Sequence, residues 1–360
     1  MKPLTLIIAG IIIIAAFGVL FLLQGRQFRI PKGETVLPDG SAQNSVPSTS
    51  ATPEAHEGIT NNSPSNTMTS HRTIATTDGV KHSIPLNEIL SGGPGKDGIP
   101  SIDNPKIIPA KEATFLADSD IGIGLTVGTE SRFYPYRILV WHEIANDTIQ
   151  GKPVLVTYCP LCATGIVFDR SVNGVVQEFG VSGMLWQSNL LMYNRAGTEA
   201  SESLWSQVLG EAVLGVDTGM RLSVVRSDVV RWGDWEKSHP DTTVLSRDTG
   251  AVRDYGRDPY GDYYTSQSVS FGATFTDTRL HPKTLVHGIE IGGAYKAYPD
   301  ESLKSMTGTV TDTFAGKDIV ITRTDAGEIS VTAGGEPIDS ISGFWFSWLA
   351  VHPDTELFTN

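Results

Sequence analysis

The sequence has little positive charge for its length. Its 360 residues carry 27 lysines and arginines against 40 aspartates and glutamates, which gives a formal net charge of -13 at pH 7. No segment gathers lysine and arginine into the basic patch that binding to a phosphate backbone requires. The composition therefore excludes nucleic acid as a partner, and the acidity is typical of a soluble domain.

Cysteine is scarce as well. The chain has two cysteines, Cys159 and Cys162, in the run YCPLC that follows the apolar residues Val154–Val156. Two thiols at this spacing can close a small redox disulfide or offer two soft ligands to one metal ion. Ala163 stands where a c-type haem site needs histidine, and the next residues predict a turn into a strand, which excludes a thioredoxin helix.

Charge is absent from Leu4–Leu23, a run of twenty mostly apolar residues that is long enough to cross a bilayer as a helix. Residues 1–3 form a short tail before it. No small-residue cleavage site follows, so an uncleaved membrane anchor is favoured over a cleaved signal peptide. We expect the membrane to be a partner through this helix.

Large apolar residues are rare between the anchor and about residue 80, where serine, threonine, proline and asparagine dominate. Such a segment cannot bury enough surface to offset the entropy of ordering, so residues 24–80 are predicted to be a flexible stalk. Anchor, stalk and globular domain together indicate a single-pass protein of the cytoplasmic membrane with its domain on the extracytoplasmic side. A cytoplasmic domain on a tether is the alternative.

An internal repeat organises the globular part. Residues 124–157 match residues 288–322 with one insertion, and each copy ends on two tryptophans followed by His-Pro-Asp-Thr, at 239–242 and at 352–355. Matched blocks in the same order indicate a duplicated unit. We expect an α+β fold rich in antiparallel strands, with two related halves at residues 81–258 and 259–360.

The two copies differ in their reactive residues, and the second is therefore interpreted as a scaffold. Cys159, Cys162, His142 and Glu143 belong to the first copy, and their counterparts in the second copy are neither thiols nor imidazole. A helix is predicted from Tyr136 to about Ala145, and its packing on the following strand would bring His142 to the cysteines. These three residues would suit copper or zinc.

Alternatives to that metal site stay open. His142 can equally be a hydrogen-bonded histidine of the core. A third ligand can also come from His281 or His287, whereas Met184 and Met192 are better explained by packing.

A catalytic set and a pocket are further predictions. The catalytic candidates are Cys159, Cys162 and Glu143. Small hydroxyl, glycine and aromatic residues that can line a pocket lie downstream, within an insertion that also carries hairpin signals such as Asn173-Gly174; these are Ser182, Gly183, Trp205, Ser206 and Gln207. The alternative is that they form a β-bulge and a strand end.

Several motifs together resemble the DUF3179 family, a domain of unknown function. They are WHEIANDT, VTYCPLCATG, FGVSG, LMYNR, LWSQ, RDYGRDPYGDYYTS and HPDTELF, and the likeness extends from about His82 to Asn360. The family pattern has a glycine where this chain has Ala163. The resemblance implies membership and an extracytoplasmic setting, and it supplies no substrate or reaction.

Two functions follow as hypotheses. In the first, an anchored extracytoplasmic protein uses the Cys-Pro-Leu-Cys site to bind a transition metal or to cycle between dithiol and disulfide. In the second, the protein is a binding or structural module in which the cysteines only close a loop. Whether the protein is an enzyme is left open by the sequence.

Overall fold

The structure, a computed structural model, describes residues 72–359 except residue 307. The predicted anchor at 4–23 and most of the predicted stalk lie outside the described residues. Strand β1 (Ala75–Thr77) pairs with β2 (Val80–His82), so sheet formation begins inside the range assigned to the stalk. No helix within the described range has the length and apolar character needed to cross a membrane.

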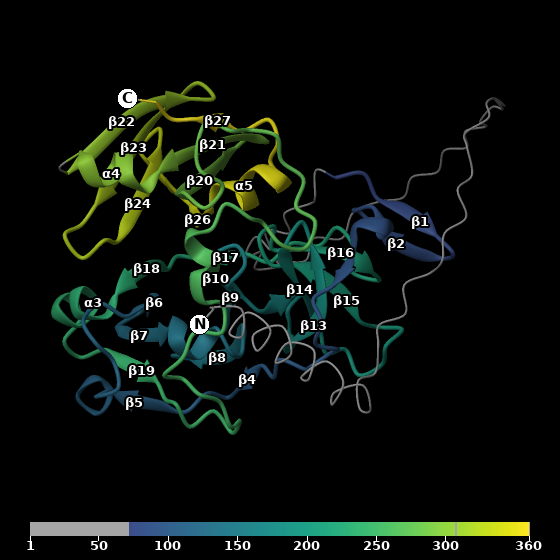
Figure 1. Ribbon diagram of the computed structural model, residues 1–360, viewed down its shortest axis with the longest axis horizontal. Helices are drawn as coiled ribbons and strands as arrows, with labels where there is room; N and C mark the ends of the chain where they lie inside the picture. Colours follow the sequence, from purple (N-terminus) through teal and green to yellow (C-terminus); the bar gives the residue numbers. More distant parts are fainter. Residues whose placement is uncertain (1–71, 307, 360) are drawn as a thin grey trace, which may run out of the picture.

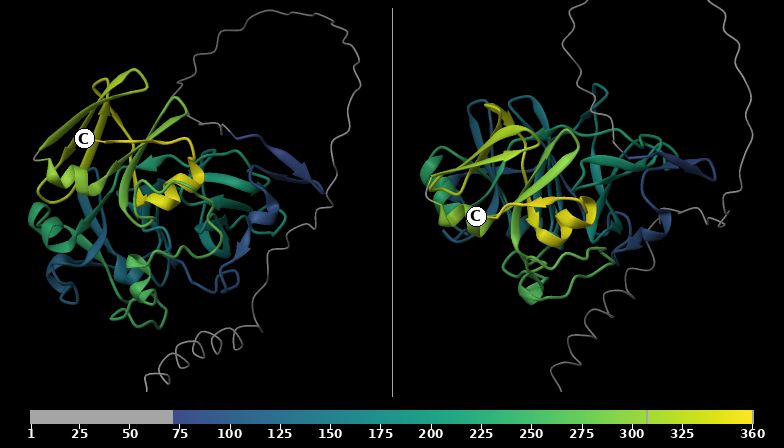
Figure 2. Two further views of the ribbon diagram at one scale, coloured as in Figure 1. Left: turned by 45° about the horizontal axis from the view of Figure 1, so that its top comes forward. Right: turned by 90° about the horizontal axis from the view of Figure 1, so that it is seen from above.

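The fold is built mainly from antiparallel sheets in a propeller-like arrangement (Figures 1 and 2). The first half contains two five-stranded sheets. One has the order β18 (Asp228–Arg231), β6 (Ile121–Val127), β7 (Glu130–Pro135), β19 (Thr243–Leu245) and β5 (Ile107–Pro109). The other has the order β17 (Val224–Val225), β10 (Thr164–Asp169), β9 (Lys152–Cys159), β8 (Ile144–Ile149) and β4 (Ile102–Asp103). The expectation of a strand-rich, mostly antiparallel fold is confirmed.

The insertion of the first half folds largely into a third sheet. Its seven strands run in the order β1, β2, β16 (Glu211–Gly215), β15 (Ser203–Ser206), β14 (Asn189–Asn194), β13 (Phe179–Trp186) and β3 (Leu90–Ser91). A two-stranded hairpin, β11 (Ser171–Val172) and β12 (Val175–Val176), turns at Asn173-Gly174, where both residues have positive φ. That is the backbone of a type I′ turn, as the Asn-Gly pair predicts.

The second half repeats the arrangement of the first without the insertion. It contains two four-stranded sheets. One has the order β26 (Ile341–Phe344), β20 (Leu285–Ile291), β21 (Ala294–Pro299) and β27 (Glu356–Leu357). The other has the order β22 (Thr309–Phe314), β23 (Lys317–Arg323), β24 (Ile329–Ala333) and β25 (Glu336–Ile338). Even the parallel pairing of β19 with β7 recurs, as the parallel pairing of β27 with β21.

Side-chain contacts recur at matching positions too. The indole nitrogen of Trp235 donates to the Thr242 hydroxyl at 2.9 Å, and that of Trp348 donates to the Thr355 hydroxyl at 2.8 Å. Each tryptophan ring packs against the glycine of a strand, at Gly124 in β6 and at Gly288 in β20. The residues shared by the two copies therefore build the structural unit, as their repetition predicted.

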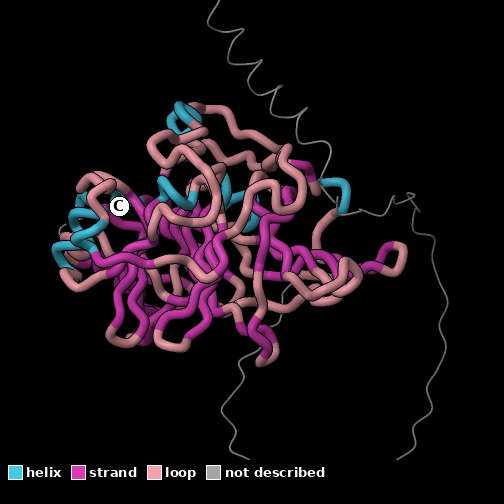
Figure 3. The backbone as a smooth tube through the Cα atoms, turned by 90° about the horizontal axis from the view of Figure 1, so that it is seen from below, coloured by secondary structure: helices cyan, strands magenta, loops and turns pink. Residues whose placement is uncertain are grey.

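Helices are short and lie at the margins of the sheets (Figure 3). They are α2 (Tyr136–Leu139), α3 (Trp232–Ser238), α4 (Asp300–Ser305) and α5 (Trp345–Val351), with 3₁₀ turns η1 (Leu86–Glu88), η2 (Ala110–Glu112) and η3 (Gly261–Thr265). Both α3 and α5 stop directly before the predicted His-Pro, because the residue before a proline disfavours helical backbone.

The helix predicted from Tyr136 to about Ala145 is wrong in its extent. Helix α2 ends at Leu139, Glu143 takes a φ of 59°, and strand β8 starts at Ile144. The hydrogen bond from Ile144 N to His142 O closes this sharp turn. The pairing of β8 with β9 along its full length outweighs continuation of the helix.

Candidate functional site

The two cysteines lie at the hairpin end where β9 turns into β10. Cys159 is the last residue of β9 and pairs with Thr164, the first residue of β10. The amide of Cys162 donates to the carbonyl of Cys159 at 3.2 Å, which folds the four linking residues into a tight turn. The predicted passage from a turn into a strand is confirmed.

Ala163 closes this turn in a left-handed conformation, with a φ of 51°. A side chain with a Cβ atom is strained there, whereas glycine is not. The left-handed backbone at this position therefore explains the glycine of the family pattern. In this chain Ala163 adopts that conformation at some cost in strain.

The two thiols are free, buried and adjacent. Cys159 is 1% exposed, Cys162 is fully buried, and the pair approaches to 3.4 Å. The carbonyl oxygen of Ser188, in the turn between β13 and β14, accepts from both thiols, at 3.1 Å from the Sγ of Cys162 and 3.9 Å from that of Cys159. The two thiols therefore share one hydrogen-bond acceptor and lie next to each other.

Asn189 makes the two sulfurs unequal. Its side-chain amide donates to the Sγ of Cys162 at 3.6 Å and to the side-chain carbonyl of Gln207 at 2.9 Å. Burial opposes ionisation of Cys162, but hydrogen bonds from Cys159 and from Asn189 lower its pKa below the ordinary value. Burial and the neighbouring sulfur raise the pKa of Cys159 well above its ordinary value. Cys162 is therefore the more acidic thiol of the pair.

Glu143 is a buried carboxyl group in electrostatic contact with the thiols. Burial first, and then the charge of Cys159, raise its pKa well above the ordinary value, so that the neutral acid is favoured. Its backbone is held in the left-handed region, and its carbonyl accepts from Tyr158 N at 2.8 Å. Strain of this kind in a polar residue is found at functional sites. Glu143 is one of the predicted catalytic residues, and that role stays a prediction.

His142 points away from the thiols. Its Nδ1 atom hydrogen-bonds with the carbonyl of Pro100 at 2.7 Å, and its Nε2 atom hydrogen-bonds with the Tyr255 hydroxyl at 2.7 Å. Burial lowers its pKa, which favours neutral imidazole. The sharp turn after α2 explains the difference from the predicted approach of His142 to Cys159 and Cys162. Within the described residues, no three His, Cys, Asp or Glu side chains form a group that could hold a metal ion.

Three tyrosines in the connection between β19 and β20 cover the pair. Tyr260, Tyr263 and Tyr264 pack against the apolar cluster that contains both cysteines. The hydroxyl of Tyr263 donates to the carbonyl of Leu161, within the cysteine turn, at 3.0 Å. The run DPYGDYY is rich in tyrosine, but no neighbouring residue in the sequence indicates that it packs against the cysteines.

A lysine fixes this cover. The ammonium group of Lys283 lies 3.4 Å from the centre of the Tyr263 ring and donates to the Ser266 hydroxyl at 2.9 Å and to the Ser268 carbonyl at 2.7 Å. A cation held over a ring face and hydrogen-bonded to the same segment stabilises that segment in one position. We call Tyr260–Ser268 the tyrosine cover.

The second half completes the site. The amide of Phe344, at the end of β26, donates to the carbonyl of Cys162 at 2.8 Å, and Phe344 and Phe346 pack into the same apolar cluster. The expectation that the second half serves as a scaffold for the thiols agrees with these contacts.

The predicted pocket residues have separate places. The register of β13 on β14 shifts between Val181 and Met184, and Gly183 has a φ of 76°. Ser182 and Gly183 therefore form the β-bulge that was the alternative to a pocket. The Ser182 hydroxyl bonds to Leu191 O inside that bulge, and the indole of Trp205 donates to Asn194 at 3.3 Å. Ser206 is fully buried. Gln207 alone among the five joins the thiol network, through Asn189.

The fold and the site thus define a strand-rich protein with two matching halves and one buried thiol pair. Residues 96–336 match the family model described as "Protein of unknown function (DUF3179)". The chain belongs to the DUF3179 family, which confirms the resemblance seen in its motifs. No curated protein and no solved structure matches the chain.

Proposed function

We propose that this protein is a membrane-anchored extracytoplasmic thiol protein in which Cys159 and Cys162 cycle between dithiol and disulfide. The observation that carries the proposal is the unequal hydrogen bonding of two adjacent thiols, because the side-chain amide of Asn189 donates to the Sγ atom of Cys162 at 3.6 Å. A pair that only staples a loop needs no such asymmetry. Reactive thiol pairs depend on it, because the more acidic sulfur attacks first.

The co-reactant is a disulfide of a partner molecule. The Cys162 thiolate attacks one partner sulfur, the partner S–S bond breaks, and a mixed disulfide forms. The sulfur of Cys159 then attacks the sulfur of Cys162 and releases the second partner thiol. Two electrons pass from the pair to the partner, and the two protons of the pair end on the two partner thiols.

Access to the pair requires the tyrosine cover to move. The closed arrangement leaves almost no exposed sulfur. The cover is tied to the cysteine turn by the hydrogen bond from Tyr263 to Leu161 and is held in place by Lys283. It lies in a long connection between β19 and β20 whose regular structure is the short 3₁₀ turn η3. Such connections open more readily than paired strands.

Copper or zinc binding remains a prediction for the same two sulfurs. Two thiolates suit a soft ion such as Cu(I), and His142 would have to leave Pro100 and Tyr255 to join them. Metal analysis of the purified, reduced protein tests this directly. A stoichiometric metal that Cys159→Ser removes would replace the redox cycle as the function of the pair.

The structural alternative is favoured by the burial of both sulfurs. It predicts that Cys159→Ser and Cys162→Ser lower stability alike and that neither forms a mixed disulfide. The redox proposal predicts that Cys159→Ser accumulates a mixed disulfide at Cys162 with a small disulfide reagent, while Cys162→Ser accumulates far less at Cys159. If both variants form equally little mixed disulfide under native conditions, the redox proposal is contradicted.

The anchor and the orientation are supported by the apolar run Leu4–Leu23 and the serine- and threonine-rich residues after it. Protease added to intact cells should remove the globular domain and leave a membrane-bound fragment. Full protection of the domain in intact cells, with digestion after lysis, would place it in the cytoplasm. We also infer that the two halves arose by duplication and that the thiols belong to the half that gained the insertion.

A further inference from the structure

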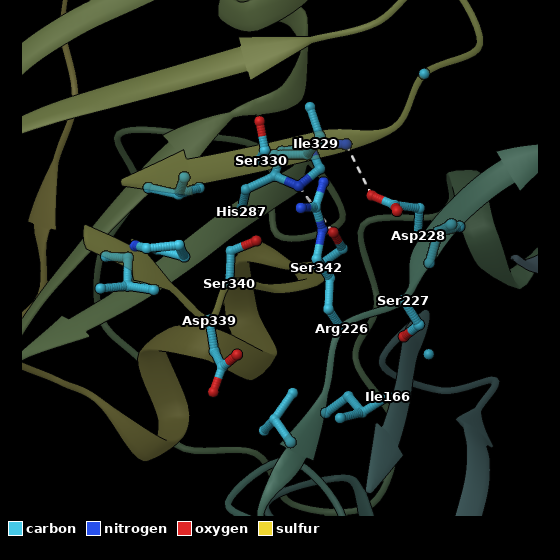
Figure 4. Close-up of a pocket in the computed structure, with 17 residues that line it drawn as sticks. Ile166, Arg226, Ser227, Asp228, His287, Ile329, Ser330, Asp339, Ser340 and Ser342 are labelled. Carbon is cyan, nitrogen blue, oxygen red and sulfur yellow. Dashed lines mark hydrogen bonds between the residues drawn. The ribbon is translucent and has the colours of Figure 1, made fainter. Parts of the chain in front are cut away.

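A cavity of about 160 Å³ lies where the two halves meet (Figure 4). The first half contributes residues that include Arg226 and Asp228, and the second half contributes Asp339, Ser342 and His287. Neither cysteine lines it. Polar groups of both signs surround an interior that also has apolar walls.

Ser342 and His287 form a hydrogen-bonded pair in its wall. They face each other across β26 and β20, and the Ser342 Oγ atom lies 2.7 Å from the Nδ1 atom of His287. The other ring nitrogen, Nε2, lies 3.1 Å from the Oδ1 atom of Asp300, the first residue of α4. Hydroxyl, imidazole and carboxylate are thus connected in series.

Asp300 fixes the direction of this series. Burial opposes its ionisation, but hydrogen bonds from His287 and Lys304 hold its pKa at about 2. The ionised carboxylate can only accept, so the Nε2 atom of a neutral His287 carries the proton. The Nδ1 atom is then an acceptor, and the Ser342 hydroxyl donates its proton to it. Lys304 holds the second carboxylate oxygen at 2.6 Å, which keeps Asp300 in place.

The first half has apolar residues at two of the three corresponding positions. Strand β18 pairs with β6 as β26 pairs with β20, and there Val229 faces Ile123 where Ser342 faces His287. Tyr136 begins α2 where Asp300 begins α4. Packing of the repeated unit therefore does not require a serine, a histidine and an aspartate. Their presence in the second half calls for another explanation.

We propose that Ser342 is an activated nucleophile for acyl transfer, with His287 as its general base and Asp300 as the residue that positions His287. This assignment goes beyond the thiol chemistry proposed above and rests on different residues. The arrangement of nucleophile, base and orienting carboxylate is recognised by geometry and not by sequence order. Here the imidazole uses Nδ1 toward the serine and Nε2 toward the carboxylate, and both nitrogens are chemically competent.

The substrate class is a small ester. Ser342 Oγ attacks the carbonyl carbon while its proton passes to His287 Nδ1; the ester C–O bond breaks, and that proton leaves with the alcohol. Water then attacks the acyl-serine, His287 takes its proton and returns it to Ser342, and a carboxylic acid is released. The cavity volume restricts the acyl group to a short chain.

Arg226 supplies positive charge to this cavity. Figure 4 shows its side chain extending toward the Ser342–His287 pair, from the segment between β17 and β18. A guanidinium there can stabilise the negative oxygen that develops on the attacked carbonyl. The site therefore draws its nucleophile and base from the second half and its cation from the first.

A fluorophosphonate probe tests the proposal on the full chain, with the labelled peptide identified by mass spectrometry. We expect labelling at Ser342 in the native protein, none at that position in Ser342→Ala, and a labelling rate about 100-fold or more lower in His287→Gln. Asp300→Asn should lower the rate and change its pH dependence, because it removes the charge that fixes the tautomer. Hydrolysis of a short-chain aryl ester should follow the same order.

Ser238→Ala is the matched control. Its hydroxyl also lies near the Nδ1 atom of a histidine, at 3.0 Å from His239, but this pair is exposed and Ser238 and His239 do not line the cavity. The control should retain labelling at Ser342. The proposal is overturned if Ser342 in the folded protein reacts no faster than after denaturation, or if folded His287→Gln is labelled at the native rate.

Discussion

The side-chain amide of Asn189 donates a hydrogen bond to the Sγ atom of Cys162 at 3.6 Å, while the side-chain oxygen of Asn189 accepts one from Val208 N at 3.0 Å. The second bond fixes the amide so that its NH₂ group faces the sulfur. Orientation of Asn189 by the backbone is therefore the device that favours a negative charge on Cys162 over Cys159.

Replacement of Asn189 by alanine should raise the pKa of Cys162 and lower the free energy of unfolding by about 1–3 kcal/mol, because Gln207 and Val208 lose buried partners. The thiolate can be followed by its ultraviolet absorbance against pH in a Cys159→Ser background. Asn194→Ala removes a comparable buried network, with Ser203 and Trp205, that does not include either sulfur. It should lower stability and leave the pKa of Cys162 unchanged. If Asn189→Ala also leaves the pKa of Cys162 unchanged, the side-chain amide of Asn189 does not stabilise the thiolate.

Tyr263→Phe should make the native thiols react faster with a small alkylating reagent. The change removes the hydrogen bond to Leu161 and keeps the ring under Lys283. A bond of about 0.5–1.5 kcal/mol corresponds to a rate increase of about 2- to 12-fold if the cover must open first. Tyr295→Phe, in a ring stacked on His352 in the second half, should have no effect on that rate. An unchanged rate in Tyr263→Phe would show that the thiols are reached by another route.

Glu143→Gln should stabilise the protein relative to the native chain, and increasingly so as pH rises. The folded-state pKa of Glu143 is raised, so between about 4.3, the unfolded value, and the folded value the folded state holds a proton that the unfolded state has lost. Stability of the native chain therefore falls with rising pH by up to about 1.4 kcal/mol per pH unit from this group.

Denaturant unfolding of both proteins at several pH values above about 5 measures the difference between them. Glutamine keeps the shape of the neutral acid and does not titrate. Glu199→Gln, the same substitution in an exposed loop, is the control. A constant difference for Glu143→Gln would mean that Glu143 is ionised in the folded state.

Gly124→Ala and Gly288→Ala should be destabilising to a similar degree, by about 1–3 kcal/mol. A Cβ atom at either position would lie 2.4 Å from a tryptophan ring, that of Trp235 or that of Trp348. Gly256→Ala, where the nearest atom is a carboxylate oxygen at 3.2 Å, is the control. Urea unfolding checks all three. If only one of the two substitutions, Gly124→Ala or Gly288→Ala, destabilises the protein, the two glycine–tryptophan contacts are not equivalent.

Features set by short stretches of sequence could be predicted. The turn at Asn173-Gly174, the end of α3 before His239-Pro240 and the bulge at Ser182-Gly183 depend on the backbone preferences of a few neighbouring residues. The repeat could be read directly because its two copies align almost without gaps. These local signals were sufficient for the strand-rich, mostly antiparallel character of the fold and for the adjacency of the thiols.

Features set by distant contacts could not be predicted in the same way. The orientation of His142 depends on Tyr255, more than a hundred residues away, and the tyrosine cover reaches the cysteine turn across a similar separation. The Ser342–His287 pair is formed by the register of β26 on β20. Each depends on contacts between segments that are far apart in the sequence, and periodicity within one segment carries no information on such contacts.

The most direct test of the central claim is equilibration of the full chain in buffers of graded thiol–disulfide ratio, with the redox state of Cys159 and Cys162 measured by mass after native quenching. We expect one reversible two-electron transition between dithiol and disulfide, with the protein folded at both ends. A pair that stays in one state across the whole range, or changes state only when the protein unfolds, would contradict this claim.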